Sequence, residues 1–369
     1  MTSNRVRSLL LVSALGALIP ACGSSDDAGT DAGRGAGGDG AGGGGNAGAG
    51  GDSVGGPPAY LEGEPPATLA HADAYDKMVD LLSQATFTVD NLGDPVDFSA
   101  SGATTPSAPT KLASLYFETE TFHTSVQAVE DKRAGVPPMP DIGASLAQDF
   151  VQDLTLGAVS ESPADARGGA RFSGWHAVRT LDTYLLLRAL QGLDERSGTG
   201  FDRALGLLWN AAGAPQGLGK RIADADAACG TQVLADLEAK LNEVRGPFAA
   251  ALETRGELDP LDRKVIRVGD SPEYDAFVPQ ADRLLHEGLA LSFVAGLRNT
   301  PLTALDQAQA LAAYGALSPR VLALNPDGDT YVGQQLDQAL PAQIDVAGMP
   351  GQPGIAGILT AAFGVTCAE

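Results

Sequence analysis

The chain has 369 residues and a formal net charge of −22, with 46 acidic residues against 24 Lys and Arg. Because an acidic surface repels phosphate groups, this charge argues against nucleic-acid binding and against adhesion to anionic lipid. The acidic residues are spread along the chain, which favours a simpler role in solubility.

The first 22 residues have the pattern of an export signal. Arg5 and Arg7 precede an apolar run over residues 9–18, which is too short to span a bilayer. The run ends in Ile19-Pro20-Ala21-Cys22 and so resembles a bacterial lipoprotein signal, in which the cysteine is lipidated and becomes the mature N-terminus. We expect residues 1–21 to be a signal peptide, and the acyl chains on Cys22, palmitate among them, to hold the protein in the bilayer.

The residues after Cys22 predict where the protein is anchored and how. Gly23 occupies a position where Asp is the usual inner-membrane retention signal in well-studied bacteria, so we expect an exported protein anchored to the outer membrane, on either face. Residues 22–56 are almost all Gly, Ala, Asp and Ser. Such a run cannot bury enough apolar surface to offset its ordering entropy, which predicts a disordered tether before a folded part at 57–369.

Two cysteines remain once Cys22 is assigned to lipid. Cys229 and Cys367 form an even pair in a compartment that is expected to be oxidising. We predict a disulfide between them, which would join the C-terminus to a mid-chain helix. Two free thiols are the alternative.

Apolar residues recur at three- and four-residue steps through most of the folded part, as in amphipathic helices. Predicted helices cover residues 72–91, 111–132, 142–156, 172–193, 201–212, 221–246, 260–268, 271–298 and 301–317, with short ones at 328–340 and 355–363. Pro247 opens either an extension of its helix or a new short one. Because strand signals are almost absent, we predict an all-α fold of two packed helical bundles, with 57–200 and 201–369 as an optional division.

Two of these helices are expected to be buried. The helix at 172–193 is apolar on nearly every face, which is typical of a central helix. In the helix at 271–298, one apolar seam includes Phe277 and Gly288, while His286 lies roughly opposite with Leu289 and other residues. A helix that is apolar on two opposed sides predicts burial between two layers.

Glu120 and His123 are spaced so that both side chains fall on one face of a predicted helix. Di-iron sites in helical bundles use this spacing, but they need a second copy and further Glu residues from other helices. The chain has one copy. The pair is therefore kept as an alternative metal site, and the competing interpretation is a solvated polar face.

Asp282 and His286 are four residues apart on one helix. This spacing can chelate a metal, and it equally allows the carboxylate to hold a histidine tautomer or to form an ion pair. The second histidine of an H-E-x-x-H motif is missing, so a zincin site is excluded. The run that begins at Asn325 lacks the Gly and Glu that a calcium loop requires, and it predicts an Asx/Gly turn instead.

The segment Gly174-Trp175-His176 resembles the G-x-H-x-x-E signature of imelysin-like proteins, which are periplasmic or outer-membrane proteins built from two helical bundles. Arg179 stands where that family has Glu, and a permanent cation weakens metal binding at this point. The run Phe201-Asp202-Arg203-Ala204-Leu205-Gly206 is similar to the F-D-x-A-x-G helix start of related helical lipoproteins. The resemblance implies a role in iron uptake or a metallopeptidase-like activity, with a divalent metal or iron as the cofactor.

Three functions follow from these patterns. The first is a membrane-anchored helical lipoprotein that acts as a binding or uptake accessory, rather than as an enzyme, for a metal, a metal complex or a peptide. Its candidate metal site combines His176, His286 and Asp282, with a satisfied core histidine as the alternative interpretation of His176. The second is a metallopeptidase-like enzyme with the same ligands at an inter-bundle site and Asp282 or Glu287 as a further ligand or base. The third is a structural envelope scaffold with no small-molecule site.

Overall fold

The computed structural model describes residues 56–84, 169–256, 272–298, 302, 304–336, 343–349 and 352–367. All of them belong to one compact unit, Ser53–Glu369. The helices predicted at 111–132, 142–156 and 260–268 lie outside the described residues. Within the described part nearly all regular structure is helical, which confirms the predicted all-α class.

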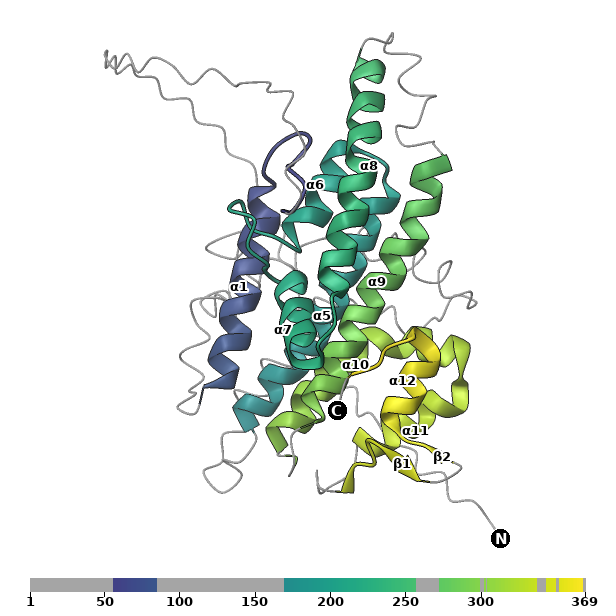
Figure 1. The fold of residues 1–369 in the computed structure, drawn as a ribbon. Helices are drawn as coiled ribbons and strands as arrows, with labels where there is room; N and C mark the ends of the chain where they lie inside the picture. Colours follow the sequence, from purple (N-terminus) through teal and green to yellow (C-terminus); the bar gives the residue numbers. More distant parts are fainter. Residues whose placement is uncertain are drawn as a thin grey trace, which may run out of the picture. The chain divides into compact units, whose positions relative to one another are not determined.

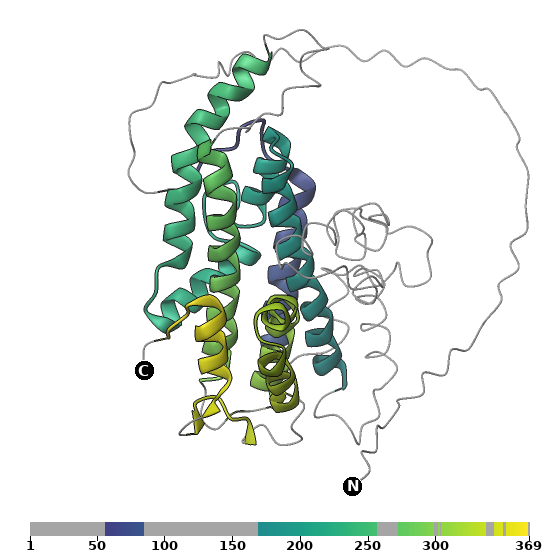
Figure 2. The same cartoon turned by 90° about the vertical axis from the view of Figure 1, so that its right-hand side faces the viewer.

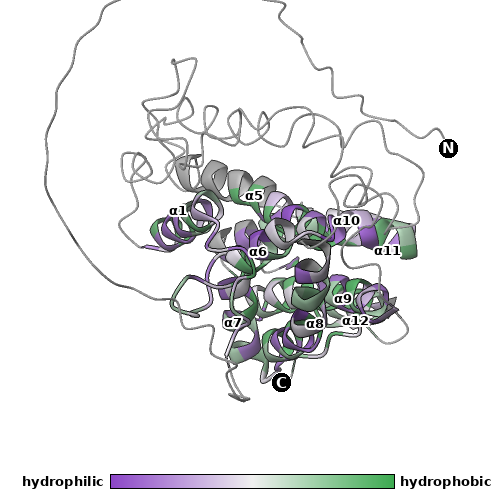
Figure 3. Ribbon diagram, turned by 90° about the horizontal axis from the view of Figure 1, so that it is seen from above, coloured by the Kyte–Doolittle hydropathy of each residue, from purple (hydrophilic) through white to green (hydrophobic). Residues whose placement is uncertain are grey.

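The described helices pack in two layers (Figures 1, 2 and 3). One layer contains α1 (Pro66–Ser83), α5 (Gly169–Asp194), α6 (Gly198–Gly206), α10 (Ala304–Leu324) and α11 (Pro326–Leu336). The other contains α7 (Leu218–Cys229), α8 (Val233–Gly256), α9 (Pro272–Gly296) and α12 (Ile355–Phe363). A short antiparallel hairpin of β1 (Gly348–Met349) and β2 (Gln352–Pro353) precedes α12.

Helix α10 holds the layers together. It packs along α5 in its own layer and against α9 in the other. One apolar cluster runs through both layers and includes Tyr75 of α1, Leu185 of α5, Leu289 of α9 and Leu359 of α12. Helices from both sides of residue 200 therefore share a single core.

The two helices that were predicted to be buried are buried. No side chain described in α5, from Val178 onward, is exposed. In α9 the seam residues Phe277 and Gly288 are buried, and so are His286 and Leu289 on the opposite side. Contacts with α7 and α8, and with α10 and α12, account for burial on both sides.

The prediction of one helix over residues 221–246 is wrong, because the chain breaks between α7 and α8. Gly230 has a φ of 69° and ends α7 in the left-handed conformation that glycine adopts without steric cost. The Asp226 carboxylate then accepts hydrogen bonds from Thr231 Oγ1 at 2.5 Å and from the backbone N–H groups of Val233 and Leu234 at 3.0 and 2.9 Å. This side chain caps the start of α8 and stabilises the break.

Three of the described helices continue through a proline. Pro247 lies inside α8, so the extension rather than the new helix is observed, and Pro279 lies inside α9. The predicted end of α10 before Pro319 is wrong, because this helix continues to Leu324. An interior proline costs one backbone hydrogen bond and a steric clash. In the turn that follows Pro319, Val321 is fully buried and Arg320 pairs with Asp282 of α9, and these contacts favour the continued helix.

Candidate functional site

The described side chains that the sequence predicted for chemistry converge on a buried polar cluster around His286. The imidazole is fully buried, and its Nδ1 lies 2.9 Å from the backbone oxygen of Asp282 and 2.9 Å from Asp282 Oδ1. Both oxygens can accept a hydrogen bond from a protonated Nδ1, which fixes the orientation of the ring. The imidazole also contacts an aromatic ring. It lies nearly parallel to the ring of Phe363 of α12, with the two centroids 6.1 Å apart and an interplanar angle of 9°.

Asp282 is shared between this histidine and a cation on the neighbouring helix. Arg320 of α10 places Nη2 at 3.0 Å from Oδ2 and 3.3 Å from Oδ1 of Asp282. The cluster of His286, Asp282, Arg320 and Phe363 therefore joins α9, α10 and α12. A guanidinium keeps its charge at all accessible pH values, so Arg320 competes with any metal cation for the oxygens of Asp282.

The remaining metal candidates are only partly within the described residues. His176 and Arg179 lie in α5, but their side chains are outside the described part, so the composite site with His286 stays a prediction. Among the side chains that the structure describes, no group of three His, Cys, Asp or Glu is placed to hold a metal ion. Glu287, the alternative base, pairs with Arg283 one turn earlier on α9.

A second buried polar cluster joins three other helices and was not predicted. Asp182 of α5 is fully buried, accepts a hydrogen bond from the Tyr75 hydroxyl of α1, and lies 3.1 Å from Arg221 Nη2 of α7. Burial raises the pKa of Asp182, while the Arg221 charge and both hydrogen bonds lower it. Burial also raises the pKa of Tyr75 well above its usual value, so the tyrosine stays a hydrogen-bond donor. The available sequence signal was Asp182 itself, an acid inside a strongly apolar helix.

The motif that begins at Phe201 holds the first described segment, which precedes α1, against α6. The buried carboxylate of Asp202 accepts hydrogen bonds from three consecutive backbone N–H groups at residues 61–63, at 2.6, 2.7 and 3.1 Å. On α8, Arg245 donates to the backbone oxygen of Ala59 at 2.6 Å. A Cβ on Gly206 would lie 2.8 Å from Pro65 Cγ, so the glycine lets α6 approach the start of α1. These contacts clamp the segment that directly follows the predicted tether.

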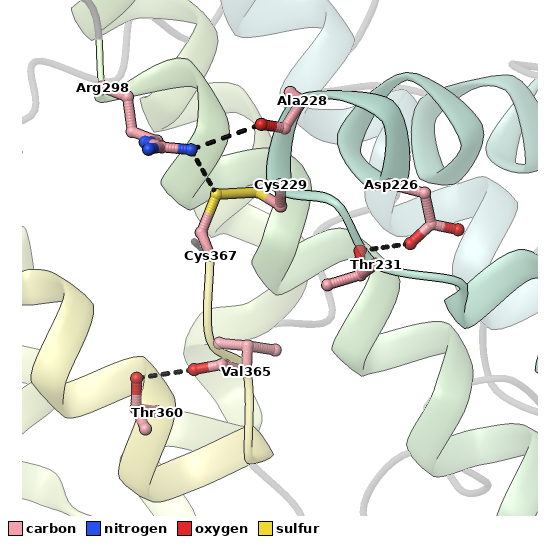
Figure 4. The surroundings of a disulfide bond; sticks show 8 residues. All are labelled: Asp226, Ala228, Cys229, Thr231, Arg298, Thr360, Val365 and Cys367. Carbon is pink, nitrogen blue, oxygen red and sulfur yellow. Dashed lines mark hydrogen bonds between the residues drawn. A yellow bond between two sulfur atoms is a disulfide. The ribbon is translucent and has the colours of Figure 1, made fainter. Parts of the chain in front are cut away.

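The predicted disulfide is present and is shown in Figure 4. Cys229 at the end of α7 bonds to Cys367 across 138 residues of sequence. Arg298 Nη1 lies 3.0 Å from Cys367 Sγ and donates to the backbone oxygen of Ala228 at 3.3 Å. This covalent link confirms the pairing of the two cysteines downstream of Cys22.

Several predicted features fall on other parts of the chain. Cys22, residues 22–55 of the predicted tether, Glu120 and His123 all lie outside the described residues. The Asx/Gly turn predicted at Asn325 is wrong, because α11 begins at Pro326 and the Oδ1 of Asn325 caps it by accepting a hydrogen bond from the backbone N–H of Gly328 at 2.9 Å. Within the described helices, none combines the length and apolar character that a bilayer crossing requires.

Comparison with known proteins identified no relative of this chain. No family model, no curated protein and no solved structure matches the chain. The functional argument therefore depends on the sequence patterns and on the geometry of the described residues.

Proposed function

We propose that this protein is an exported lipoprotein, anchored to the outer membrane through acyl chains on Cys22, that acts as a binding or uptake accessory. The observation that supports export from the cytosol is the Cys229–Cys367 disulfide. Disulfides form and persist in oxidising compartments and are rare in the cytosol. The chain has three cysteines, so this pairing leaves Cys22 as the single thiol available for lipid.

Two buried acids of the folded part are engaged in ion pairs between helices. Asp182 and Asp282 each form an ion pair with an arginine of another helix, at 3.1 and 3.0 Å. Groups engaged in this way hold helices in register, and they are not poised to transfer a proton to a substrate. The proposed ligand is a divalent metal ion or a metal complex, with His176 of α5 as a candidate ligand residue. The similarity of Gly174-Trp175-His176 to the imelysin signature supports this choice.

Anchoring is tested in a Gram-negative host that expresses the full chain and is fed a clickable palmitate analogue. The chain should become labelled and should fractionate with the outer membrane, and Cys22→Ala should abolish both. Cys367→Ala is the matched control and should keep the label, because its cysteine is engaged in the disulfide. Labelling that survives Cys22→Ala, or a chain recovered from the cytosol with three free thiols, would contradict the anchor.

Binding is tested on the full mature chain with Zn²⁺ and Fe²⁺ as separate probes. Equilibrium dialysis followed by elemental analysis should give about one bound ion per chain, and His176→Ala should lose most of it. His71→Ala, which removes a histidine from α1, is the control and should retain the metal. If neither ion binds the unaltered chain, or if His176→Ala binds as well as the control, the metal-binding function is wrong.

A further inference from the structure

Helix α12 covers the His286 cluster. Its buried face presents Ile355, Ile358, Leu359 and Phe363, and the helix packs on α9 and α10. Phe363 is the residue that lies over the imidazole of His286. An apolar helix of nine residues is too short to be stable alone in water, so its position depends on the contacts that hold it.

The two ends of α12 are held in different ways. At the N-terminal end, the backbone N–H groups of Ile355 and Ala356 donate to the oxygens of Asp345 and Val346, at 3.2 and 3.0 Å. At the C-terminal end, the chain turns at Gly364, which has a φ of 76°. Only three residues later Cys367 is bonded to Cys229, so the disulfide is the covalent link that fixes this end of α12 to α7 (Figure 4).

The two cysteine residues differ in burial. Cys229 is buried, whereas Cys367 is partly exposed near the end of the chain. The Arg298 guanidinium lies beside the bond, with Nη1 at 3.0 Å from Cys367 Sγ. A cation at this distance stabilises the thiolate that Cys367 becomes when it leaves a mixed disulfide with the reductant. Of the two cysteines, Cys367 is therefore the less buried target for a reductant.

We propose that the Cys229–Cys367 disulfide is a redox latch, and that its reduction releases α12 from α9 and uncovers His286. The reductant is a dithiol. One of its thiolates attacks Cys367 Sγ, the bond between the two cysteine sulfurs breaks, and Cys229 leaves as a thiolate that takes a proton from solvent. The second thiol of the reductant then displaces Cys367 from the mixed disulfide. The chain gains two electrons and ends with two thiols, and the reductant ends as a disulfide. This inference does not depend on the proposed metal or on the lipid anchor.

The test is hydrogen–deuterium exchange and histidine modification of the full mature chain, with and without dithiothreitol. Reduction should accelerate backbone exchange at residues 355–367 at least tenfold and should leave the core of α5 protected. Modification of His286 by diethyl pyrocarbonate, read by peptide mass spectrometry, should rise by a similar factor. His71, which is buried in α1, is the internal control and should keep its rate.

Two variants separate the latch from a general loss of structure. Cys367→Ser should reproduce the effect of dithiothreitol without any reductant. Phe363→Ala keeps the disulfide and should raise the labelling of His286 while residues 364–367 stay protected. The latch is wrong if reduction changes neither exchange nor labelling. It is equally wrong if α5, α8 and α12 lose protection together, since the bond would then support the whole fold.

Discussion

Arg221 of α7 donates from Nη2 to Asp182 Oδ2 of α5 at 3.1 Å, and only 14% and 1% of their side chains are exposed. The acid therefore has its countercharge on a helix 39 residues away along the chain. The Tyr75 hydroxyl from α1 completes the arrangement. The three side chains thus connect α1, α5 and α7 through one buried group of hydrogen bonds.

Replacing Arg221 alone should lower the free energy of unfolding far more than replacing Arg221 and Asp182 together. Arg221→Met leaves Asp182 buried without its countercharge and should lower the free energy of unfolding by about 3–5 kcal/mol. The double variant with Asp182→Asn should lose much less than the sum of the two single variants. Urea denaturation of all four proteins gives the coupling, and additive single effects would show that the pair contributes nothing.

The carboxyl group of Asp76 should make stability fall as pH rises. Burial raises its pKa from 3.8 to about 6, against the opposing effects of the Gly217 N–H and of Lys220. Between these two values the folded chain holds more protons than the unfolded chain. The stabilisation of the folded chain by the protonated Asp76 is therefore fully present below pH 3.8 and is lost as pH rises through 6.

Asp76→Asn should remove this pH dependence. Asparagine can still accept the hydrogen bond from the Gly217 N–H, which measures 2.8 Å in the native chain. The variant should be more stable than the native chain by about 1–2 kcal/mol at neutral pH and equal to it near pH 4. Asp327→Asn on an exposed position of α11 is the control. A constant difference between Asp76→Asn and the native chain from pH 4 to 7 would contradict the assignment.

Asp202 should govern the order of the segment at which the folded part begins. Asp202→Ala removes the acceptor for three backbone N–H groups and should cost about 2–3 kcal/mol. Exchange at residues 56–63 should accelerate more than exchange anywhere in α9. Asp202→Asn keeps one acceptor oxygen and should fall between the native chain and the alanine variant. Equal exchange in all three proteins would mean that α8 alone holds this segment.

Gly288 of α9 lies against Ile222 of α7. A Cβ at this position would lie 2.6 Å from Ile222 Cγ1, so Gly288→Ala should destabilise the fold by about 1–3 kcal/mol despite the better helix propensity of alanine. Gly333 of α11 provides the control, because a Cβ added there would meet no neighbouring atom within 4 Å. Gly333→Ala should stabilise the chain by about 0.5–1 kcal/mol. Thermal unfolding of the two variants should show shifts of opposite sign.

Local features of the sequence were sufficient to predict much of the fold. The helix at 355–363 was predicted with the bounds that α12 has, because an apolar run lies between Gly354 and Gly364. The burial of α5 followed from its apolar composition, and the burial of α9 on two sides followed from its two apolar faces. The pairing of Cys229 with Cys367 followed from cysteine count alone, once Cys22 had been assigned to lipid.

The errors in helix bounds arose where non-local contacts outweigh local preference. Gly230 was available as a signal for the end of α7, but the capping of α8 by Asp226 depends on how the chain reverses there. Pro319 was taken as a stop, yet α10 continues past it, with Arg320 bonded to Asp282 of α9 and Val321 buried. Tertiary burial therefore overrides the intrinsic cost of an interior proline.

By itself, the sequence determined the helical class and the disulfide pairing, because both follow from composition and residue count. Tertiary structure alone decided that Asp182 meets Arg221 and Tyr75, and that Asp282 meets Arg320. A buried charge is stable only beside a partner, and the partner here comes from another helix that the packing of two layers brings into reach. Spacing along one helix predicted the contact of His286 with Asp282, but the position of Phe363 over that ring could come only from the fold.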